Sequence, residues 1–502
     1  MSAGNPVVDN DSLKSLAKGG SFILFGTISR KILTLAFSWI LALLLGPGGV
    51  GMFWLAMAVY SISVMVGSLG FPQGLVRYIS KEGNLRGFPA WHKLAFLAVM
   101  CGLACSLVTG IALVFLSAPL AASLLKDEEF RWVFRLVAFS VPFGVLTSLF
   151  LSITQGLKDM LPTMKLAHLM DISLKIVIFL LLSLLGWKLG GALSAHAIAS
   201  VLICWLSYNL VRRTVNLPWT AFAFTLESKN FMVFSAWMLS CNLLYVLVEW
   251  VSTIMVGHFL VPAEVGIFGM ALRWATVCGL FLTAFNPIFA PLLSEALGKK
   301  DTAVMRRLYQ AEVRWVITAT APFLIILLLF AEPLLALAGQ EFARGAPVLR
   351  IIAAGVFINA ATGSASDFFI MAGWTKFVFF SSVATCAMNI ALSFLLIPQY
   401  GIIGAALATA TTTAFMNIFC ASCVMLVFRI GPYTAKLLKP LTAACLSTAV
   451  GLFAKTAFFA NGWPASAAVT GIAYLAFIRL FGIDEEDMQV MPKRLKFLFG
   501  KR

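Results

Sequence analysis

Charge, histidine and catalytic motifs are all scarce in this 502-residue sequence. Only 12% of the residues are charged and four are histidines, whereas 61% are hydrophobic. A soluble protein of this length needs a larger polar surface, so the composition excludes a soluble globular protein. The sequence has no glycine-rich phosphate loop, His/Glu metal motif or nucleophile elbow. It therefore predicts no enzyme, no metal site and no cofactor.

Hydrophobic segments long enough to cross a bilayer recur along the whole chain. About 20 helical residues span the hydrocarbon core, and the short segments of alternating polarity that indicate a β-barrel are missing. We predict an all-α polytopic membrane protein with about fourteen transmembrane helices. The predicted spans cover approximately residues 20–45, 49–71, 93–117, 133–156, 164–186, 189–211, 231–258, 265–288, 313–331, 348–373, 377–397, 401–427, 437–457 and 464–482. The first is too long for a signal peptide and no cleavage site follows it, so we expect it to be retained.

The net charge of +16 indicates membrane topology rather than binding to nucleic acid. Cations gather in the even-numbered connections between the predicted spans, for example in residues 77–93 and 299–314. The odd-numbered connections are nearly uncharged or carry both signs. The positive-inside rule then places both termini in the cytoplasm, in a multi-pass protein of the cytoplasmic (inner) membrane. The same cations favour anionic lipids.

The first half of the chain has a copy about 215 residues later. Six residues recur at this single offset: Pro47, Val50, Gly51, Phe53, Ala56 and Pro72 correspond to Pro262, Val265, Gly266, Phe268, Ala271 and Pro287. A second match relates residues 189–193 to residues 403–407, at an offset of 214. Six spans separate each element from its copy, so the copies share one orientation. Parallel repeats of this kind have a central substrate site between them.

The repeat predicts how the chain is divided. We expect a cytoplasmic tail (1–18), an N-terminal six-helix bundle (19–211), a cytoplasmic linker (212–230), a C-terminal six-helix bundle (231–430), two extra transmembrane helices (431–482) and a second cytoplasmic tail (483–502). The two extra helices have no partner in the repeat, so we expect them outside the repeated core.

Two adjacent cations, Arg30 and Lys31, lie in the middle of the first predicted span. A charge near the bilayer centre costs roughly 2.5–3.5 kcal/mol on insertion scales, so some interaction must offset this cost. Arg30 alone can extend along its own aliphatic stem to the inner surface. Neighbouring residues project about 100° apart on a helix, so the two cannot both do so equally well. We therefore predict that they face a water-filled cavity.

Five further charged residues within the predicted spans are candidates for a site or an ion pair. Arg273 either pairs with Glu249, which lies at a similar depth in the outer half, or faces the cavity. Asp171 and Lys175 are four residues apart in the acid-then-base order, which favours a structural ion pair over a functional one. Asp367 is either a ligand of a coupling ion or a hydrogen-bonded acid of the core.

The repeat does not copy these charges. At the repeat offset, Arg30, Arg273 and Glu249 correspond to Tyr245, Ala58 and Thr34. A fold that is built twice does not need charges that occur once, so the charges are better explained by a binding site. An excess of cations there predicts a preference for an anion.

Three segments carry a resemblance to a known family. They are residues 45–51 (LGPGGVG), 74–80 (GLVRYIS) and 401–406 (GIIGAA). The sequence resembles polysaccharide-transporter flippases of the Wzx type, in the multidrug/oligosaccharidyl-lipid/polysaccharide exporter superfamily, over most of residues 12–430. The resemblance implies a V-shaped pair of six-helix bundles that works by alternating access. It also implies transport of a polyprenyl-diphosphate-linked oligosaccharide, such as an O-antigen or exopolysaccharide unit, from the inner to the outer leaflet.

The resemblance further implies site residues and partners. In related lipid II flippases, basic residues of the first and eighth helices line the cavity and meet the diphosphate, which assigns substrate binding to Arg30, Lys31 and Arg273. The relatives also use two extra C-terminal helices in a groove for the lipid tail. The implied partners are the lipid-linked glycan, the bilayer, a glycan polymerase and glycosyltransferases. For the sugar chain, the candidate polar and aromatic wall residues, otherwise packing residues, are Trp39, Tyr60, Trp237, Asn242 and Tyr245.

Two other functions compete with this one. A cation-coupled drug or metabolite antiporter of the same superfamily needs a net acidic cavity, and the first span contains no carboxylate. A non-transporting scaffold for envelope assembly predicts that all the buried charges are neutralised in pairs, without a cavity.

Overall fold

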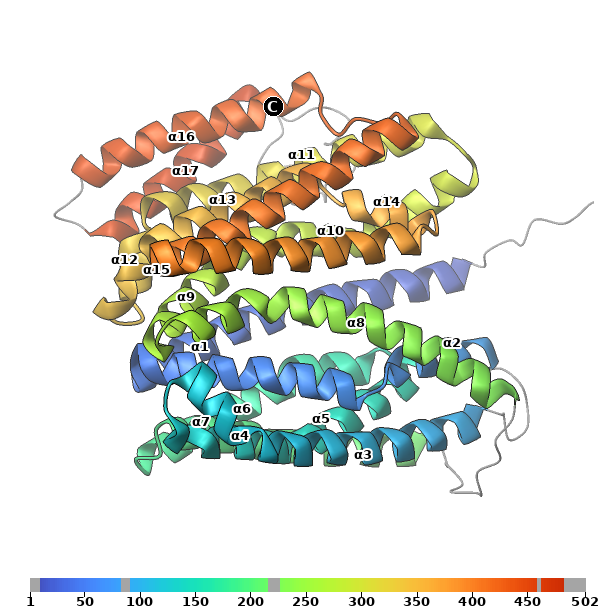
Figure 1. The fold of residues 1–502 in the computed structure, drawn as a ribbon. Coiled ribbons are helices and arrows are strands. Elements are labelled where there is room, and N and C mark those ends of the chain that lie inside the picture. The colour runs from blue at the N-terminus through green and yellow to red at the C-terminus, as the bar shows by residue number, and fades with distance from the viewer. Residues whose placement is uncertain (1–9, 83–90, 215–225, 458–461, 483–502) are drawn as a thin grey trace, which may run out of the picture. The chain divides into compact units, whose positions relative to one another are not determined.

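The protein is described by a computed structural model that covers residues 10–82, 91–214, 226–457 and 462–482. Every regular element in these residues is a helix (Figure 1). The first half contains α1 (Asn10–Gly67), α2 (Phe71–Glu82), α3 (Trp91–Phe115), α4 (Ser117–Leu120), η1 (Ala121–Leu125), η2 (Glu128–Phe130), α5 (Arg131–Gly156), η3 (Thr163–Met170), α6 (Asp171–Leu184) and α7 (Leu189–Thr214). The second half contains α8 (Leu226–Phe259), α9 (Pro262–Ala275), η4 (Thr276–Gly279), α10 (Leu280–Gly298), α11 (Thr302–Leu329), α12 (Ala331–Ala336), η5 (Gln340–Gly345), α13 (Ala346–Thr362), α14 (Ala365–Met371), α15 (Thr375–Phe428), η6 (Ala435–Leu437), α16 (Leu438–Ala457) and α17 (Trp463–Phe481).

Two long helices each contain two of the predicted spans. Among the described residues, 12 helices are long and apolar enough to cross a membrane, and the longest cover residues 28–67 and 375–428. Gly46 interrupts the first of these with φ 65° and ψ −179°, directly before Pro47. Gly401 interrupts the second with φ 58° and ψ −136°. Glycine adopts this left-handed region without the steric cost that a Cβ brings. Twelve helices, two of them divided, correspond to the fourteen spans predicted from the sequence.

The order of the elements repeats along the chain. A long helix, short helical turns and a second long helix follow one another in α3 to α5 and again in α11 to α13. Helix α5 begins at Arg131 and helix α13 begins 215 residues later, at Ala346. The pair α6 and α7 is matched by the two halves of α15. Helices α16 and α17 come after the second copy and have no counterpart in the first.

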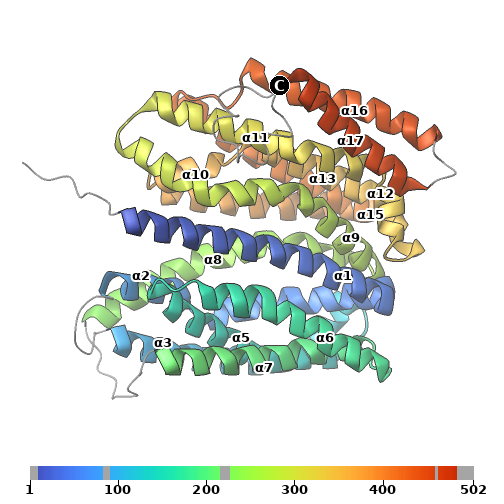
Figure 2. The same cartoon turned by 180° about the vertical axis from the view of Figure 1, so that it is seen from behind.

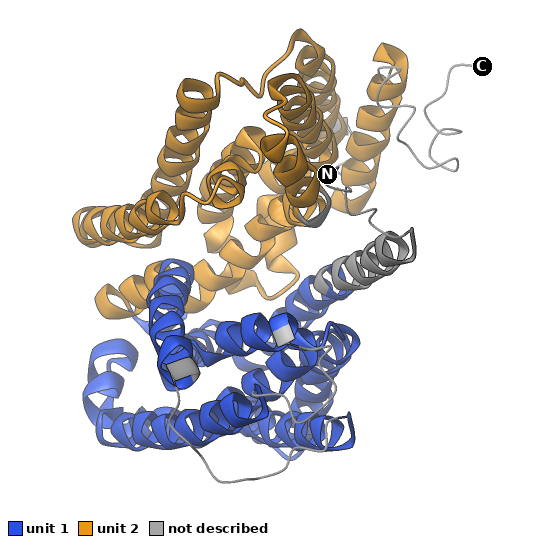
Figure 3. Cartoon of the chain, turned by 90° about the vertical axis from the view of Figure 1, so that its right-hand side faces the viewer, with its two compact units in different colours: residues 1–250, 261–263 blue, residues 251–260, 264–502 orange. Residues whose placement is uncertain are grey.

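The helices form two compact units, which are coloured in Figure 3. Unit 1 contains residues 1–250 and 261–263, and unit 2 contains residues 251–260 and 264–502. The chain therefore passes between the units within α8. Most of the predicted linker, residues 215–225, lies outside the described residues, as do positions 1–9 and 483–502 of the predicted tails.

The start of α1 corrects one prediction. Residues 1–18 were expected to form a tail that precedes the first helix, but α1 begins at Asn10. The segment Asn10-Asp11-Ser12 consists of residues that favour helix N-termini, and no proline interrupts residues 10–18. Polarity alone therefore misplaced the start of the helix by nine residues.

Helix α2 joins the core of unit 1 by packing against α8. The rings of Phe71 and Phe231 stack with centroids 5.3 Å apart, and the Arg77 guanidinium lies 4.3 Å from the centroid of the Phe234 ring. Gly70 precedes α2 with φ 70°, and a Cβ at this position would lie 2.6 Å from the backbone nitrogen of Leu239. The absent side chain is what allows this close approach. Helices α3, α5 and α7 complete the core of unit 1, and α5 packs against both α3 and α7 (Figure 2).

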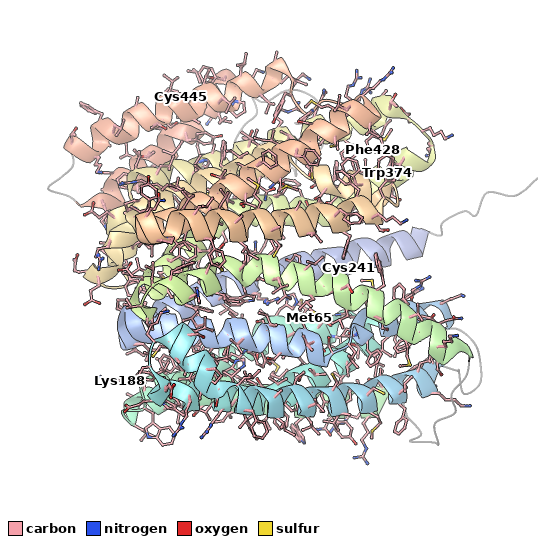
Figure 4. The ribbon with its side chains drawn as sticks, viewed as in Figure 1. Met65, Lys188, Cys241, Trp374, Phe428 and Cys445 are labelled. Atoms are coloured by element: carbon pink, nitrogen blue, oxygen red, sulfur yellow. The ribbon has the colours of Figure 1, made fainter. Side chains whose placement is uncertain are left out.

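Helix α11 is the centre of unit 2. It packs against α10, α13, α16 and α17. The Tyr474 hydroxyl of α17 donates a hydrogen bond to the Thr318 carbonyl oxygen of α11 over 2.9 Å, beside a cluster that includes Ile325 and Ile478. The two extra C-terminal helices are thus attached to unit 2 through α11. The two ends of α15 belong to the same unit, and the rings of Trp374 and Phe428 lie 6.4 Å apart (Figure 4).

Candidate functional site

The Arg30–Lys31 pair lies on α1 in unit 1. Arg30 is exposed and Lys31 is partly buried. Arg30 lies sixteen residues before the break at Gly46, about 24 Å along the helix. A hydrocarbon core is about 30 Å thick, so the distance from Gly46 to the pair is within the length of one crossing. From the pair, α1 continues back to Asn10.

Residues of α8 and η3 surround Arg30. Its charge acts on Tyr245 of α8 and on His168 of η3. Tyr245 also interacts electrostatically with Glu249, one turn further along α8. The Tyr245 side chain is 71% exposed, and Glu249 is exposed as well. Unit 1 therefore presents two cations, one acid and an accessible aromatic ring on neighbouring helices.

Arg273 belongs to the other unit. Its guanidinium Nη1 donates a hydrogen bond to the Gly269 carbonyl oxygen, one turn earlier in α9, over 3.1 Å. The side chain is partly buried. Glu249 lies in unit 1 and Arg273 in unit 2. That Arg273 binds the substrate stays a prediction.

Asp171 and Lys175 form an ion pair inside unit 1. Lys175 Nζ lies 2.7 Å from Asp171 Oδ2, and their side chains are 15% and 24% exposed for Lys175 and Asp171. The pair is part of a polar cluster, because the Asp171 charge acts on Tyr60 of α1 and the Lys175 charge acts on His196 of α7. The rings of Tyr60 and His196 meet edge to face, 4.5 Å apart.

This cluster changes the interpretation of Tyr60. The sequence made it a candidate for the sugar-binding wall, but its ring is directed into unit 1 toward His196. The other aromatic candidates are more accessible: Trp39, Trp237 and Tyr245 are 41%, 48% and 71% exposed. Accessible rings suit a wall, whereas Tyr60 is partly buried and contacts His196.

Breaking the ion pair from one side is expected to destabilise the protein. Lys175→Ala leaves the Asp171 carboxylate mostly buried beside an aromatic cluster, and removing one partner of a buried pair costs about 3–5 kcal/mol. Because both side chains keep some exposure, we expect a loss near the lower end of that range. Thermal unfolding of the purified protein measures it. The double variant Asp171→Asn/Lys175→Gln, which removes both charges, should recover most of the stability and keep transport. A stable double variant without transport would contradict a structural role.

A cluster of acidic side chains in unit 2 contains Asp367, which the sequence predicted as a candidate, and Glu312, which it did not. Asp367 lies on α14, next to the break at Gly363, where the sequence predicted one continuous span. Gly363 has φ 63°, and a Cβ there would lie 2.6 Å from Val313 Cγ2. Glu312 of α11 lies beside the break and is only 4% exposed. It was missed because the ninth span was predicted to begin at residue 313, whereas α11 begins at Thr302.

Metal-binding groups were the remaining kind of site to consider. Within the ranges that the structure describes, no group of three or more histidine, cysteine, aspartate or glutamate side chains is arranged to hold a metal ion. Each unit contains one of the two clusters of ionisable side chains described above.

Two family models match the chain. The model of the polysaccharide biosynthesis protein family matches residues 16–297, more than half of the sequence. The MatE model matches residues 238–395. No curated protein matches the chain.

Solved membrane transporters share the fold. A structure of the lipid II flippase MurJ in an inward closed conformation has a TM-score of 0.71 and 15% identity, covering 91% of this chain and 98% of that chain. An inward-facing multidrug resistance transporter of the MATE family, in the MOP superfamily, has a TM-score of 0.65 and 16% identity, covering 80% and 94%. A mutant of the Vibrio cholerae MATE transporter VcmN has a TM-score of 0.57 and 16% identity, covering 82% and 97%. At these identities the likeness concerns the fold.

Proposed function

Because the chain belongs to the polysaccharide biosynthesis protein family, we propose that it is a flippase for a polyprenyl-diphosphate-linked oligosaccharide. It is a multi-pass membrane transporter of a flippase-like fold and not an enzyme. The proposed movement is from the inner to the outer leaflet of the cytoplasmic membrane, by alternating access. Both termini are proposed to be cytoplasmic, which the cations of the even-numbered connections support.

The Arg30–Lys31 pair is the observation that carries the proposal. No carboxylate occurs on α1 between residues 28 and 67, and the two cations are adjacent. A diphosphate offers several anionic oxygens, and charge-assisted hydrogen bonds to such oxygens are about twice as strong as neutral ones. The planar Arg30 guanidinium suits two phosphate oxygens at once, while the Lys31 ammonium acts as a point charge. The pair is thus suited to one headgroup.

The surroundings of the pair support a sugar chain next to that headgroup. Tyr245 lies within electrostatic reach of Arg30 and is largely exposed. Aromatic side chains with a few polar groups are typical of the walls of small-molecule sites. We propose that Tyr245 and Glu249 contact the first sugar, with the glutamate as a hydrogen-bond acceptor for hydroxyl groups. Arg273 of unit 2 is proposed as a further cation for the substrate.

A cation-coupled drug antiporter is the second candidate. The MatE match over residues 238–395 favours it, as does the fold of the multidrug transporters. The charges separate the two candidates, because an organic cation is repelled by Arg30 and Lys31 whereas a diphosphate is attracted.

Reconstitution tests the proposal directly. The purified protein is placed in liposomes that contain a fluorescent short-chain polyprenyl diphosphate carrying one sugar, and movement to the other leaflet is followed by quenching from outside. We expect the diphosphate lipid to cross faster than its monophosphate analogue and faster than in protein-free liposomes. Organic-cation uptake under the same conditions, without movement of the diphosphate lipid, would support the antiporter and contradict the flippase.

A further inference from the structure

The break between α13 and α14 is held by side chains of α11. The Tyr309 hydroxyl donates to the Thr362 carbonyl oxygen over 2.6 Å. The Ser364 backbone N–H donates to Glu312 Oε2 over 3.4 Å. Both contacts are buried, and they bind the last residue of α13 and the residue before α14. The Glu312 carboxylate therefore takes the place of the helical hydrogen bonds that are lost at Gly363.

Three acceptors converge on the Ser364 hydroxyl. Its Oγ is hydrogen-bonded to Glu312 Oε1 and lies 2.6 Å from Asn286 Oδ1. Asp367 lies three positions after Ser364, its backbone N–H donates to the Ser364 carbonyl oxygen over 3.0 Å, and its carboxyl interacts with the Ser364 side chain. A serine hydroxyl carries one proton and can donate it to one acceptor only. If the oxygen and nitrogen of the Asn286 amide are exchanged, its NH₂ group faces Ser364 Oγ and donates to it, so this contact does not need the serine proton. Two carboxyls then still compete for one proton.

The shortage of donors affects the protonation of Glu312 and Asp367. Glu312 is 4% exposed, and the Asp367 charge acts on it. Glu312 is buried and Asp367 is partly buried. Two ionised carboxylates that act on each other in such surroundings repel each other, and such pairs retain a proton between them. We propose that Glu312 and Asp367 form a proton-binding site that holds one shared proton at neutral pH, with Ser364 as the bridge.

The groups around the pair leave the proton as the best ligand. Helix α10 contributes the uncharged Asn286, and α11 contributes Tyr309 next to Glu312. Beyond Tyr309 lie Cys420 of α15 and Tyr433 of the following connection. Arg314, also on α11, is two positions from Glu312 and so projects about 200° away around the helix. Two carboxyls are fewer than the three side chains of a typical metal-binding group, and the described residues contain no such group.

Release of the proton would act on the helix break. With both acids ionised, α11 and α14 carry like charges at their contact, and the bridge of Ser364 satisfies only one of them. The contact between α11 and the start of α14 is then weakened. The site thus couples the protonation state of unit 2 to the connection between α13 and α14. This inference does not depend on which substrate is carried.

Infrared spectroscopy of the full-length protein tests the site. A protonated carboxyl has a C=O stretch that is separate from that of a carboxylate, and its frequency depends on hydrogen bonding. At neutral pH, we expect one such band that disappears in Glu312→Gln and in Asp367→Asn, and that shifts in Ser364→Ala. The matched control is Glu332→Gln, the same change at an exposed glutamate of α12, which should leave the band unchanged.

Each result decides the proposal. Absence of any protonated-carboxyl band in the wild type at neutral pH overturns it, without any variant. A band that survives both carboxyl variants also overturns it. Where these two variants do not fold, Ser364→Ala decides, because a band at an unchanged frequency excludes the bridge. A band that changes only when sodium is added would assign the site to a monovalent cation instead of a proton.

Thermal unfolding as a function of pH gives a second readout. If the folded protein holds one proton more than the unfolded chain, stability falls as the pH rises, and the folding equilibrium constant decreases by about tenfold per pH unit. We expect this decrease between about pH 4.3, where a glutamate of the unfolded chain releases its proton, and neutral pH in the wild type, and its loss in Glu312→Gln. An identical pH dependence in the two proteins would contradict the proposal.

Discussion

Replacing Arg30 with alanine is expected to abolish glycan export while the protein still inserts and accumulates. A hydrogen bond to a charged group contributes about 1.5–3 kcal/mol, and two such bonds from one guanidinium correspond to a loss of about a hundredfold or more in binding. Removing the cation also removes an insertion cost of roughly 2.5–3.5 kcal/mol, so the amount of protein should not fall. Export of the glycan to the cell surface, divided by the amount of protein in the membrane, measures the effect.

Companion variants separate an anion site from a structural pair. Arg30→Lys keeps the charge and loses the two-pronged hydrogen bonding, so it should retain partial export. Glu249→Gln makes the site more positive and should keep substrate binding if Arg30 serves an anion. If Arg30 serves only to pair with Glu249, the two neutralising variants should be equally harmful. Arg212→Ala, at an exposed arginine of α7, is the control for a lost surface cation. Export at normal levels in both Arg30→Ala and Lys31→Ala would end the anion-site hypothesis.

Gly70→Val is expected to prevent unit 1 from folding. Residue 70 has φ 70°, and its missing side chain faces the backbone of α8 at Ser235 and Leu239. Backbone atoms of a packed helix cannot turn aside as a flexible side chain can, so α2 would be displaced from α8. A left-handed backbone costs roughly 1–2 kcal/mol for a residue with a Cβ, and the displacement adds a loss of packing to this. A combined loss beyond about 4–5 kcal/mol belongs to the exceptional range for one substitution.

Two glycine controls divide this effect into its parts. Gly46 has φ 65° but nothing within 4 Å of an added Cβ, so Gly46→Ala should show the backbone cost alone. Gly298→Ala, in open space with no left-handed φ, should be close to neutral. The amount of monodisperse protein after detergent extraction measures all three variants. Normal yield of Gly70→Val would show that α2 does not pack against α8 in this way.

Features that depend on neighbouring residues could be predicted from the sequence. Hydropathy predicted the spans. The breaks at Gly46-Pro47 and at Gly401 divide two long helices close to the predicted boundaries between the first and second spans and between the eleventh and twelfth spans. The spacing of Asp171 and Lys175 predicted the ion pair that the helix forms. These predictions succeed because helix length, turn geometry and contacts four residues apart are local properties of the chain.

Contacts between residues that are distant in sequence became visible in the folded structure. Ser364 reaches Glu312 across 52 positions of sequence, and no local pattern indicates that one serine bridges two acids. Tyr60 was a candidate for either a sugar-binding wall or packing, and its ring meets that of His196, which lies on another helix. The need for glycine at position 70 came from α8, more than 160 residues later. Side chains in a close-packed interior are placed by the helices that surround them, so these contacts follow from packing rather than from the residues beside them in sequence.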